Sequence, residues 1–237
     1  MRRPVGSELF GGRLADCVYL DLSVRAVNDI SPRLRSITFE SPDLVGFEWQ
    51  PGQDIMFDVP GAESVGRRRY TIRRADPLAG TADVEVVLHG HGPFGNWAAA
   101  TVPGDRIEGI GPRGAQLLHD DATHHLFVAD ESAVPATMAM LEGLPPGATG
   151  TAWCVTDDGT ATCPADGDVH WLTAGELAAA LAATPLPDGT AAYVNGERSL
   201  VRDAVTVLQG RGLERIASKA YWRRDRANAA HGEPPRE

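Results

Sequence analysis

The pattern of apolar residues changes near residue 118, and this change limits the folds open to the chain. Before it, apolar and polar residues alternate in short segments separated by Pro, Gly and Asp clusters, which is typical of a β-barrel or sandwich. The segments predicted as strands are 17–27, 34–41, 53–59, 68–74, 82–90 and 105–111. One short helix is predicted before the last of these strands, over residues 92–100.

After residue 118, strands and helices alternate, which favours a parallel sheet with helices on both faces. The predicted strands are 125–130, 150–156, 169–173, 190–196 and 215–222, and the predicted helices are 131–144, 174–183 and 197–212. The last helix has one apolar face, formed by Leu200, Val201, Ala204, Val205 and Leu208. We therefore expect an antiparallel β domain at residues 1–117, an α/β domain at 118–225 and a disordered polar tail at 226–237.

Charge and cysteine content exclude several classes of function. The chain of 237 residues has a net charge of −10, which argues against general nucleic-acid binding. Its only lysine is Lys219, so any local anion site is made mostly of arginine. The three cysteines, Cys17, Cys154 and Cys163, lack zinc-ligand spacing, and we predict neither a metal site nor a disulfide framework. With no signal-peptide core and no apolar run of membrane-spanning length, we expect a cytoplasmic monomer or dimer.

Residues 67–74 concentrate positive charge in a predicted strand, since five of these eight residues are arginine. Side chains two residues apart share a face of a strand. One face carries Arg68, Tyr70 and Ile72, and the other carries Arg69, Thr71 and Arg73. An arginine two residues before a tyrosine can fork onto a phosphate while the ring lies against a flat heterocycle. The neighbouring threonine can then bond an edge atom of that heterocycle. An exposed, charged barrel strand is the alternative.

The stretch LHGHGPFGNWA, residues 88–98, joins a strand end to the predicted short helix. Its glycines permit tight turning, and Pro93 suits the first turn of a helix. Backbone N–H groups at a helix start bind phosphate, and His89 at the strand end can stack on a flat ring or donate to phosphate. Gly-rich loops are common, however, and Trp97 also suits a core position.

Two polar segments lie at strand-to-helix junctions of the second half, VADESAVPA at 128–136 and YVNGERS at 193–199. Ligands of open α/β sheets bind at such carboxyl ends of strands. The acids can equally serve to favour a helix N-terminus. The polar residues singled out here are Asp130, Glu131, Ser132 and Glu197. A third segment, SKAYWRRD at 218–225, combines aromatic residues with three cations.

In this order, the segments resemble the siderophore-interacting proteins, flavin-dependent ferric-siderophore reductases related to ferredoxin reductases. Arg68 to Arg73 match the family motif R-x-Y-T-x-R. HGHGPFGNWA matches an H-x-x-x-G-P-x-x-x-W-A-like stretch with the gap shortened by one residue, and Gly111–Gly114 match a G-P-R-G turn. ADESAVPA, NGER and AYWRRD match later family segments more loosely, so the resemblance spans residues 17–225.

The resemblance implies a six-stranded antiparallel Greek-key barrel that holds FAD, followed by a Rossmann-like, NAD(P)H-binding-like domain. Arg68 would hold the FAD pyrophosphate, Tyr70 would pack on the isoalloxazine, and Thr71 would bond near its reactive nitrogen. The glycine-rich turn would hold ribityl, phosphate or adenine parts of the cofactor. The implied cofactor-binding residues are Arg68, Tyr70, Thr71, Ile72, Arg73, His89, Gly92, Pro93, Gly95, Asn96 and Trp97.

The implied activity is ferric-siderophore reduction in iron uptake. Electrons from NADH, NADPH or a ferredoxin would pass through FAD to chelated Fe(III), and Fe(II) would leave. Ferric siderophores are often anionic, so the substrate-binding candidates are Lys219, Trp222, Arg223 and Arg224. Asp130, Glu131, Ser132 and Glu197 would lie on the nicotinamide side. Outer-sphere electron transfer needs no catalytic acid or base, and none is assigned.

The chain departs from the family pattern mainly in its second half. Ala129, Ala220 and Asp225 stand where the family has glycine, whereas Gly95 stands where it often has serine. These departures leave open a family member co-opted for biosynthesis, either a flavin-dependent reductase or a non-redox cyclase that uses FAD as a scaffold. A flavin-binding module without a substrate is the third alternative.

Overall fold

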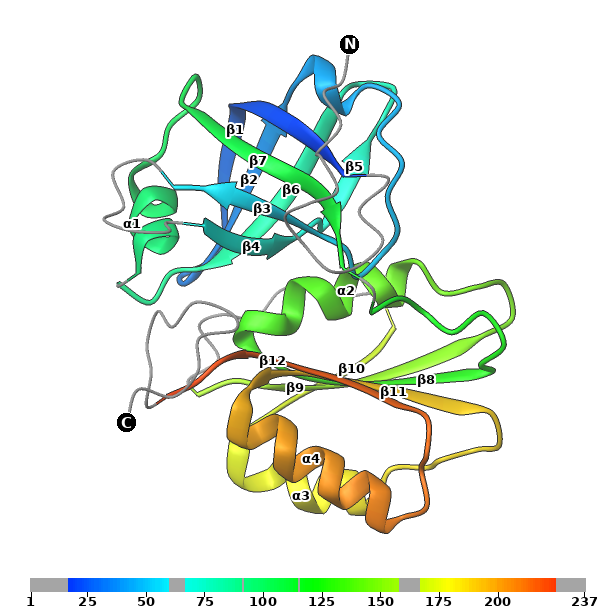
Figure 1. Ribbon diagram of the computed structural model, residues 1–237. Helices are drawn as coiled ribbons and strands as arrows, with labels where there is room; N and C mark the ends of the chain where they lie inside the picture. Colours follow the sequence, from blue (N-terminus) through cyan, green and yellow to red (C-terminus); the bar gives the residue numbers. More distant parts are fainter. Residues whose placement is uncertain (1–16, 60–66, 91, 115, 158–166, 225–237) are drawn as a thin grey trace, which may run out of the picture. The chain divides into compact units, whose positions relative to one another are not determined.

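The structure is a computed structural model that describes residues 17–59, 67–90, 92–114, 116–157 and 167–224 (Figure 1). Contacts divide the chain into two units. The first unit comprises Met1–Leu118 together with Met138–Gly143, and the second comprises His119–Thr137 and Leu144–Glu237. Cys163 and the predicted tail at 226–237 lie outside the described residues.

The first unit is built on a seven-stranded sheet with the strand order β4-β3-β7-β1-β2-β6-β5. All neighbouring pairs are antiparallel. The strands are β1 (Val18–Ser31), β2 (Leu34–Glu40), β3 (Asp54–Asp58), β4 (Arg67–Thr71), β5 (Arg74–Asp76), β6 (Thr81–Val87) and β7 (Arg106–Arg113). A 3-10 helix, η2 (Pro42–Leu44), follows β2, and helix α1 (Pro93–Ala100) lies between β6 and β7.

The arginine-rich segment closes this sheet in a way that corrects the sequence prediction. One strand is predicted over residues 68–74, but the structure divides it into β4 and β5, which lie on opposite edges of the sheet. The Ile72 amide donates to the Gln53 carbonyl (2.9 Å), beside β3, while the Arg73 amide donates to the Asp83 carbonyl (2.8 Å) of β6. The chain thus joins both edges, and the sheet closes as a barrel. The count of seven strands instead of six follows from this change of partner.

The interior of the barrel is filled by the apolar residues of the alternating pattern. In β1 the buried side chains are Leu20, Leu22 and Val24, each 1% exposed or less. The residues between them point outward, because successive side chains of a strand face opposite sides. Phe39, Phe57 and Phe94 are the bulkiest side chains of this core. Full burial of one such side chain stabilises the fold by about 1.5–3 kcal/mol.

The second unit contains a five-stranded parallel sheet with the order β10-β9-β8-β11-β12. Its strands are β8 (His124–Asp130), β9 (Thr149–Val155), β10 (Asp168–Leu172), β11 (Thr190–Glu197) and β12 (Ile216–Trp222). Its helices are η3 (Glu131–Ala133), α3 (Ala174–Ala183) and α4 (Arg198–Gly210), together with the start of α2 (Val134–Glu142), whose residues from Met138 onward belong to the first unit. Helices α3 and α4 cover one face of the sheet, and α2 begins on the other (Figure 1). The strand order reverses between β8 and β11, the point where such sheets bind ligands.

Local sequence explains the helices of this unit. In α4, Val201, Ala204 and Leu208 are buried in the core with the sheet, which confirms most of the predicted apolar face. Glu197, predicted as the first helical residue, is instead the N-cap, and its carboxylate accepts from the amides at the helix start. Helix α3 begins with a capping box formed by Thr173 and Glu176.

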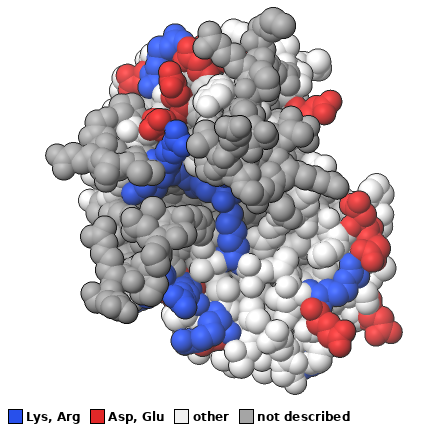
Figure 2. Space-filling model, viewed as in Figure 1, with Lys and Arg blue, Asp and Glu red and all other residues white. Residues whose placement is uncertain are grey.

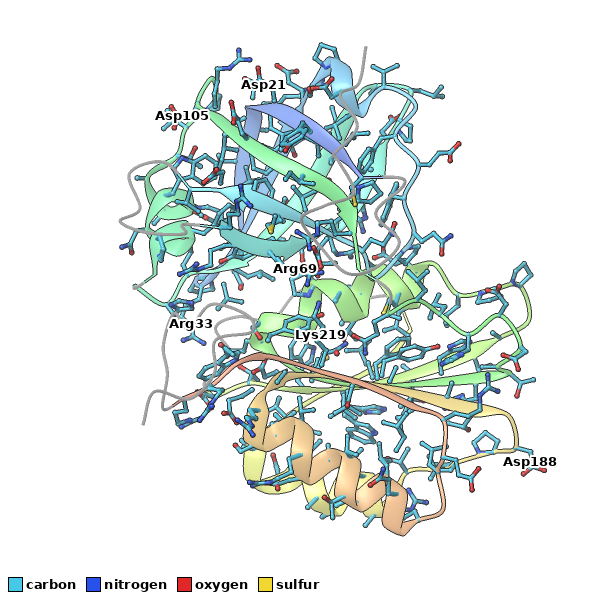
Figure 3. All side chains as sticks on the ribbon, viewed as in Figure 1. Asp21, Arg33, Arg69, Asp105, Asp188 and Lys219 are labelled. Carbon is cyan, nitrogen blue, oxygen red and sulfur yellow. The ribbon has the colours of Figure 1, made fainter. Side chains whose placement is uncertain are left out.

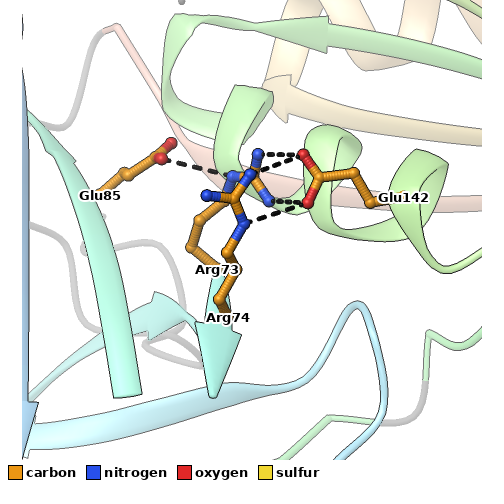
Figure 4. Close-up of polar contacts among 4 residues, drawn as sticks. All are labelled: Arg73, Arg74, Glu85 and Glu142. Carbon is orange, nitrogen blue, oxygen red and sulfur yellow. Dashed lines mark hydrogen bonds and ion pairs between the residues drawn. The ribbon is translucent and has the colours of Figure 1, made fainter. Parts of the chain in front are cut away.

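A buried arginine ties the end of α2 to the barrel strands of the first unit (Figure 4). Arg73 is 5% exposed, and its guanidinium donates to both carboxylate oxygens of Glu142, at 2.8 and 2.6 Å. Its Nε lies 3.3 Å from Oε1 of Glu85, and Arg74 adds two longer bonds to Glu142. The bonds from Arg73 lower the pKa of Glu142 to about 2, although partial burial opposes them and Arg74 assists them. Burial raises the pKa of Glu85 instead.

We expect Glu142→Gln to lower the free energy of unfolding at pH 7 by about 1–3 kcal/mol, because a buried guanidinium loses a charged acceptor. The effect belongs at the lower end, since the Glu142 side chain is 40% exposed and solvent screens it. The folded pKa of Glu142 lies below the unfolded value, so its stabilisation is present above about pH 4.5 and is lost as the pH falls towards 2. Urea unfolding of both proteins at pH 7 and at about pH 3 measures this difference.

The matched control is Arg74→Gln, whose side chain is 62% exposed. We expect it to change the free energy of unfolding by at most about 0.5 kcal/mol. If the wild type and Glu142→Gln differ as much at about pH 3 as at pH 7, the stabilising role of the ionised carboxylate is contradicted.

Candidate functional site

Tyr70 of β4 and helix α1 are held together by packed aromatic rings. The ring centroids of Tyr70 and Phe94 lie 4.1 Å apart, with 27° between the ring planes. Phe94 packs in turn on Phe57 of β3, at 4.9 Å, and on Trp97, at 5.3 Å. Phe94 is 1% exposed, so this cluster fixes the start of α1 against β4.

The start of α1 presents two backbone amides that have no acceptor within the helix. Its N-cap is Gly92, whose φ of 89° lies in the left-handed region that favours glycine, and Pro93 has no N–H to donate. The Asn96 amide bonds back to the Gly92 carbonyl at 2.9 Å. The N–H groups of Phe94 and Gly95 therefore have no acceptor within the helix and point out of its N-terminus. This arrangement suits an anion.

His89 lies beside these amides. A Cβ built on Gly95 would be 3.9 Å from Cε1 of the His89 ring, with no other atom that close. His89 is exposed at the end of β6, whereas Gly95 is buried. An accessible imidazole therefore lies next to the start of α1.

Arg68 and Tyr70 project from the same side of β4, as the alternation predicts. Burial raises the pKa of Tyr70 to about 12, and the positive charge of Arg68 opposes the rise. Tyr70 is therefore a neutral hydrogen-bond donor at physiological pH. The Arg68 side chain donates to the Arg67 carbonyl at 2.9 Å, close to the strand from which it projects. One region thus combines a guanidinium, a flat phenol and the amide start of a helix.

Three of the residues predicted to bind the cofactor have side chains that are engaged within the barrel. Ile72 is fully buried in the barrel core, and its amide is bonded to Gln53. The guanidinium of Arg73 is paired with Glu142 and Glu85. Trp97 stacks against Phe39, with 6.2 Å between ring centroids and 10° between planes. These side chains pack inward because the chain turns towards the core after Thr71 and α1 packs its Trp97 side on the barrel core. The part of these three residues in cofactor binding stays a prediction.

Of the remaining predicted cofactor residues, Gly95 is buried and the others are half-buried or exposed. Thr71 ends β4 and is half-buried, Gly92 and Pro93 are half-buried, and Asn96 is exposed on α1. The sequence did not single out Phe94, which supports the Tyr70 ring, or Asp54, which binds Arg69 through two bonds of 2.8 and 2.5 Å. The Asp54–Arg69 pair explains why Arg69, labelled in Figure 3, is not interchangeable with Arg68.

In the second unit, the predicted acids lie at the carboxyl ends of β8 and β11. Asp130 accepts hydrogen bonds from Ser132, Glu197 and Trp222. Burial raises the pKa of Asp130, and these bonds oppose the rise. Burial alone would raise the pKa of Glu197 too, but hydrogen bonds from Ser199, Arg224 and Leu200 outweigh it and lower that pKa. The structure therefore engages both carboxylates in hydrogen bonds within the fold.

Glu131 and the predicted substrate cations lie on β12 or close to the carboxyl ends of these parallel strands. Glu131 accepts from the Thr156 hydroxyl at 2.7 Å. On β12, the Lys219 ammonium (labelled in Figure 3) lies 5.3 Å from the centroid of the Tyr221 ring. Trp222 is 42% exposed, Arg223 is half-buried and Arg224 is exposed. Figure 2 shows several groups of Lys and Arg side chains at the surface, so the net charge of −10 leaves room for local anion sites.

Among the residues that the structure describes, no group of three or more His, Cys, Asp and Glu side chains could hold a metal ion. Among the same residues, no helix is both long enough and apolar enough to cross a membrane.

Comparisons with known proteins agree with the two-part pattern of the chain. Residues 52–116 match the siderophore-interacting FAD-binding domain, and residues 122–225 match the siderophore-interacting protein family. An uncharacterized protein of Mycobacterium tuberculosis is 34% identical over 199 residues, which cover 73% of this chain and 70% of that protein. The ferric vibriobactin reductase ViuB of Vibrio cholerae is 29% identical over 241 residues, covering 86% of this chain and 89% of ViuB.

Two further proteins support the same relationship. The NADPH-dependent ferric-chelate reductase of Escherichia coli is 29% identical over 239 residues, covering 87% of this chain and 94% of the reductase. The crystal structure of a siderophore utilization protein from T. fusca has a TM-score of 0.79 and 27% identity, covering 92% of this chain and 97% of that one. By fold and by sequence, the chain belongs to the siderophore-interacting protein family.

Proposed function

We propose that this protein is an FAD-dependent ferric-siderophore reductase. The observation that carries the proposal is the packing of Tyr70 on Phe94 at the start of α1, with Arg68 two residues before Tyr70 on the same face of β4. This set combines phosphate-binding groups with a flat ring, which is the combination that a flavin dinucleotide requires. The match of residues 52–116 to an FAD-binding domain supports the assignment.

Each residue of this set has a distinct part in holding FAD. Arg68 binds the pyrophosphate through its forked guanidinium. The backbone N–H groups at the start of α1 donate further hydrogen bonds to phosphate oxygens. Tyr70 would pack on the isoalloxazine with one face of its ring. Phe94 packs on the phenol ring and holds Tyr70 in position. Thr71 bonds near the reactive nitrogen, while His89 and Asn96 line the ribityl or adenine side.

FAD supplies the redox chemistry when it is bound, passing electrons one at a time to chelated Fe(III). The chain binds and orients the cofactor and the chelate, and no side chain needs to move a proton in this step. Lys219, Arg223 and Arg224 attract an anionic ferric siderophore, and the exposed face of Trp222 adds apolar contact. Fe(II) binds such chelators more weakly and leaves.

The donor we propose is NADH or NADPH, with a ferredoxin as the other source of electrons. The E. coli relative is an NADPH-dependent ferric-chelate reductase, and the Vibrio relative is a ferric vibriobactin reductase. These relatives favour a reductase over the co-opted biosynthetic enzyme or cyclase that the sequence left open.

The purified protein is expected to be yellow and to release FAD, not FMN, on denaturation. The reason is that Arg68 and the helix start together offer more phosphate-binding groups than the single phosphate of FMN requires. Absorbance spectra and chromatography of the released flavin test this. A colourless protein that cannot be reconstituted with FAD would overturn the proposal.

Arg68→Ala should weaken FAD binding about 10- to 150-fold, because a charge-assisted hydrogen bond contributes roughly 1.5–3 kcal/mol. The matched control is Arg106→Ala, an arginine of β7 that is 66% exposed and paired with Asp21. Titration of the apoprotein with FAD gives both dissociation constants. Equal affinities in the two variants would show that Arg68 does not hold the cofactor.

Replacing Lys219, Arg223 and Arg224 together with Gln should slow reoxidation of the reduced flavin by a ferric siderophore and flatten its dependence on salt. Exposed charges are screened beyond about 8 Å at physiological ionic strength, so the wild type should lose rate steeply as salt rises. Anaerobic reoxidation of photoreduced protein at low and high salt measures both effects, with FAD content as the control. Equal, slow reoxidation of both proteins at every salt concentration would remove the siderophore claim and leave the FAD claim standing.

A further inference from the structure

Asp130, predicted from the sequence to lie on the nicotinamide side, accepts hydrogen bonds at both carboxylate oxygens within the second unit. It is 8% exposed, and each carboxylate oxygen accepts two hydrogen bonds. Oδ1 accepts from the amide of Ser132 at 2.9 Å and from its hydroxyl at 2.5 Å. Oδ2 accepts from the amide of Glu197 and from Nε1 of Trp222, each at 2.7 Å.

All four of these donors are uncharged, and together they offer only N–H or O–H groups. A carboxylate can satisfy them because it accepts at both oxygens. An asparagine has an oxygen on one side only, so its NH2 group would face either the Ser132 amide or the Glu197 amide and the Trp222 indole, and Asn disturbs this arrangement. Capping the short helix η3 needs only the bond from the Ser132 amide, which other cap residues could also accept. The bonds from Glu197 and Trp222 go beyond that need and favour a carboxylate at this position.

The backbone around Asp130 is shaped to admit this carboxylate. Gly196 has a φ of 134°, and a Cβ on it would lie 2.6 Å from Cγ of Asp130. The pairing of β11 with β12 shifts register between Gly196 and Glu197, next to the amide that Asp130 binds. Both features allow a side chain from the end of β8 to reach across β11.

The residue reached in this way is the last of β12. Trp222 is followed directly by Arg223 and Arg224, and the Arg224 amide donates to Oε1 of Glu197 at 3.3 Å. Two carboxylates from the ends of β8 and β11 thus hold the chain where it leaves β12. In these contacts the two carboxylates bind backbone amides and the indole, so they act on the course of the backbone and on the Trp222 ring.

We propose that Asp130 is a positioning residue for the substrate: by binding the indole of Trp222 it fixes the Trp222–Arg224 segment, so that its two arginines meet an anionic ferric chelate in a defined geometry. This role rests on the proposed function. Ordering the segment before substrate arrives lowers the entropy lost on binding.

The test uses the full-length, FAD-loaded protein with three variants, Trp222→Phe, Asp130→Asn and the double variant. Trp222→Phe keeps an aromatic ring and removes only the Nε1 donor. The matched control is Trp153→Phe, an indole of β9 that packs in the core of the same unit. The probe is the ferric complex of a synthetic tris-catecholate, added anaerobically to photoreduced protein. Hydrogen–deuterium exchange of the amides at 222–224 is measured in parallel.

We expect Trp222→Phe and Asp130→Asn each to raise the half-saturating concentration of the chelate about 10-fold, which corresponds to about 1.4 kcal/mol, with little change in the limiting rate. The double variant should be no worse than either single variant, because both remove one interaction. Exchange at 222–224 should quicken in all three, and Trp153→Phe should match the wild type in both measurements.

Other outcomes separate the inference from the proposed function. An effect of Trp222→Phe without one of Asp130→Asn would show that Trp222 touches the chelate directly, and additive effects would show that the residues act independently; either result overturns the inference. Unchanged exchange at 222–224 overturns it as well, even if Asp130→Asn folds poorly, because Trp222→Phe alone reports on the bond. A wild type that the chelate cannot reoxidise overturns the proposed function itself, and with it the substrate role of Asp130.

Discussion

The first unit depends on the change of hydrogen-bonding partner at Ile72 and Arg73. Up to Thr71 the chain pairs with β3, and from Arg73 onward it pairs with β6, so one segment joins both edges of the sheet. The change keeps Arg68 and Tyr70 on a strand that faces α1. It also turns the Arg73 guanidinium inward, where Glu142 and Glu85 compensate its burial.

The two units use charge differently. The first brings positive and N–H donor groups together around Arg68 and the start of α1, which suits an anionic cofactor. The second places the carboxylates of Asp130 and Glu197 where backbone amides and an indole satisfy them. Both acids form hydrogen bonds within the fold at the carboxyl ends of β8 and β11. The acidic composition of this half therefore does not by itself describe the electrostatic potential that a ferric chelate would meet.

Much of the fold was predictable because its signals are local. Alternation with period two marked the strands, and the apolar face of α4 marked a helix against the sheet. The pairing of Arg68 with Tyr70 on one face was equally readable from spacing. The spacing gave no sign of where the strand would end, so the sequence did not predict that the side chains of Ile72 and Trp97 pack on the core or that Arg73 forms a buried ion pair. Phe94 was overlooked because an aromatic residue in a short helix carries no signal of which ring it will support.

By itself, the sequence determined the succession of strands and helices, the family, and the segments that carry the candidate site, since each is written in neighbouring residues. Only the tertiary structure decided what those side chains bind. Glu142, the partner of Arg73, lies 69 residues along the chain, and Trp222, a donor to Asp130, lies 92 residues beyond that carboxylate. Such choices depend on which buried polar groups meet once the strands have paired, and a buried charge takes the partner that packing brings within hydrogen-bonding distance.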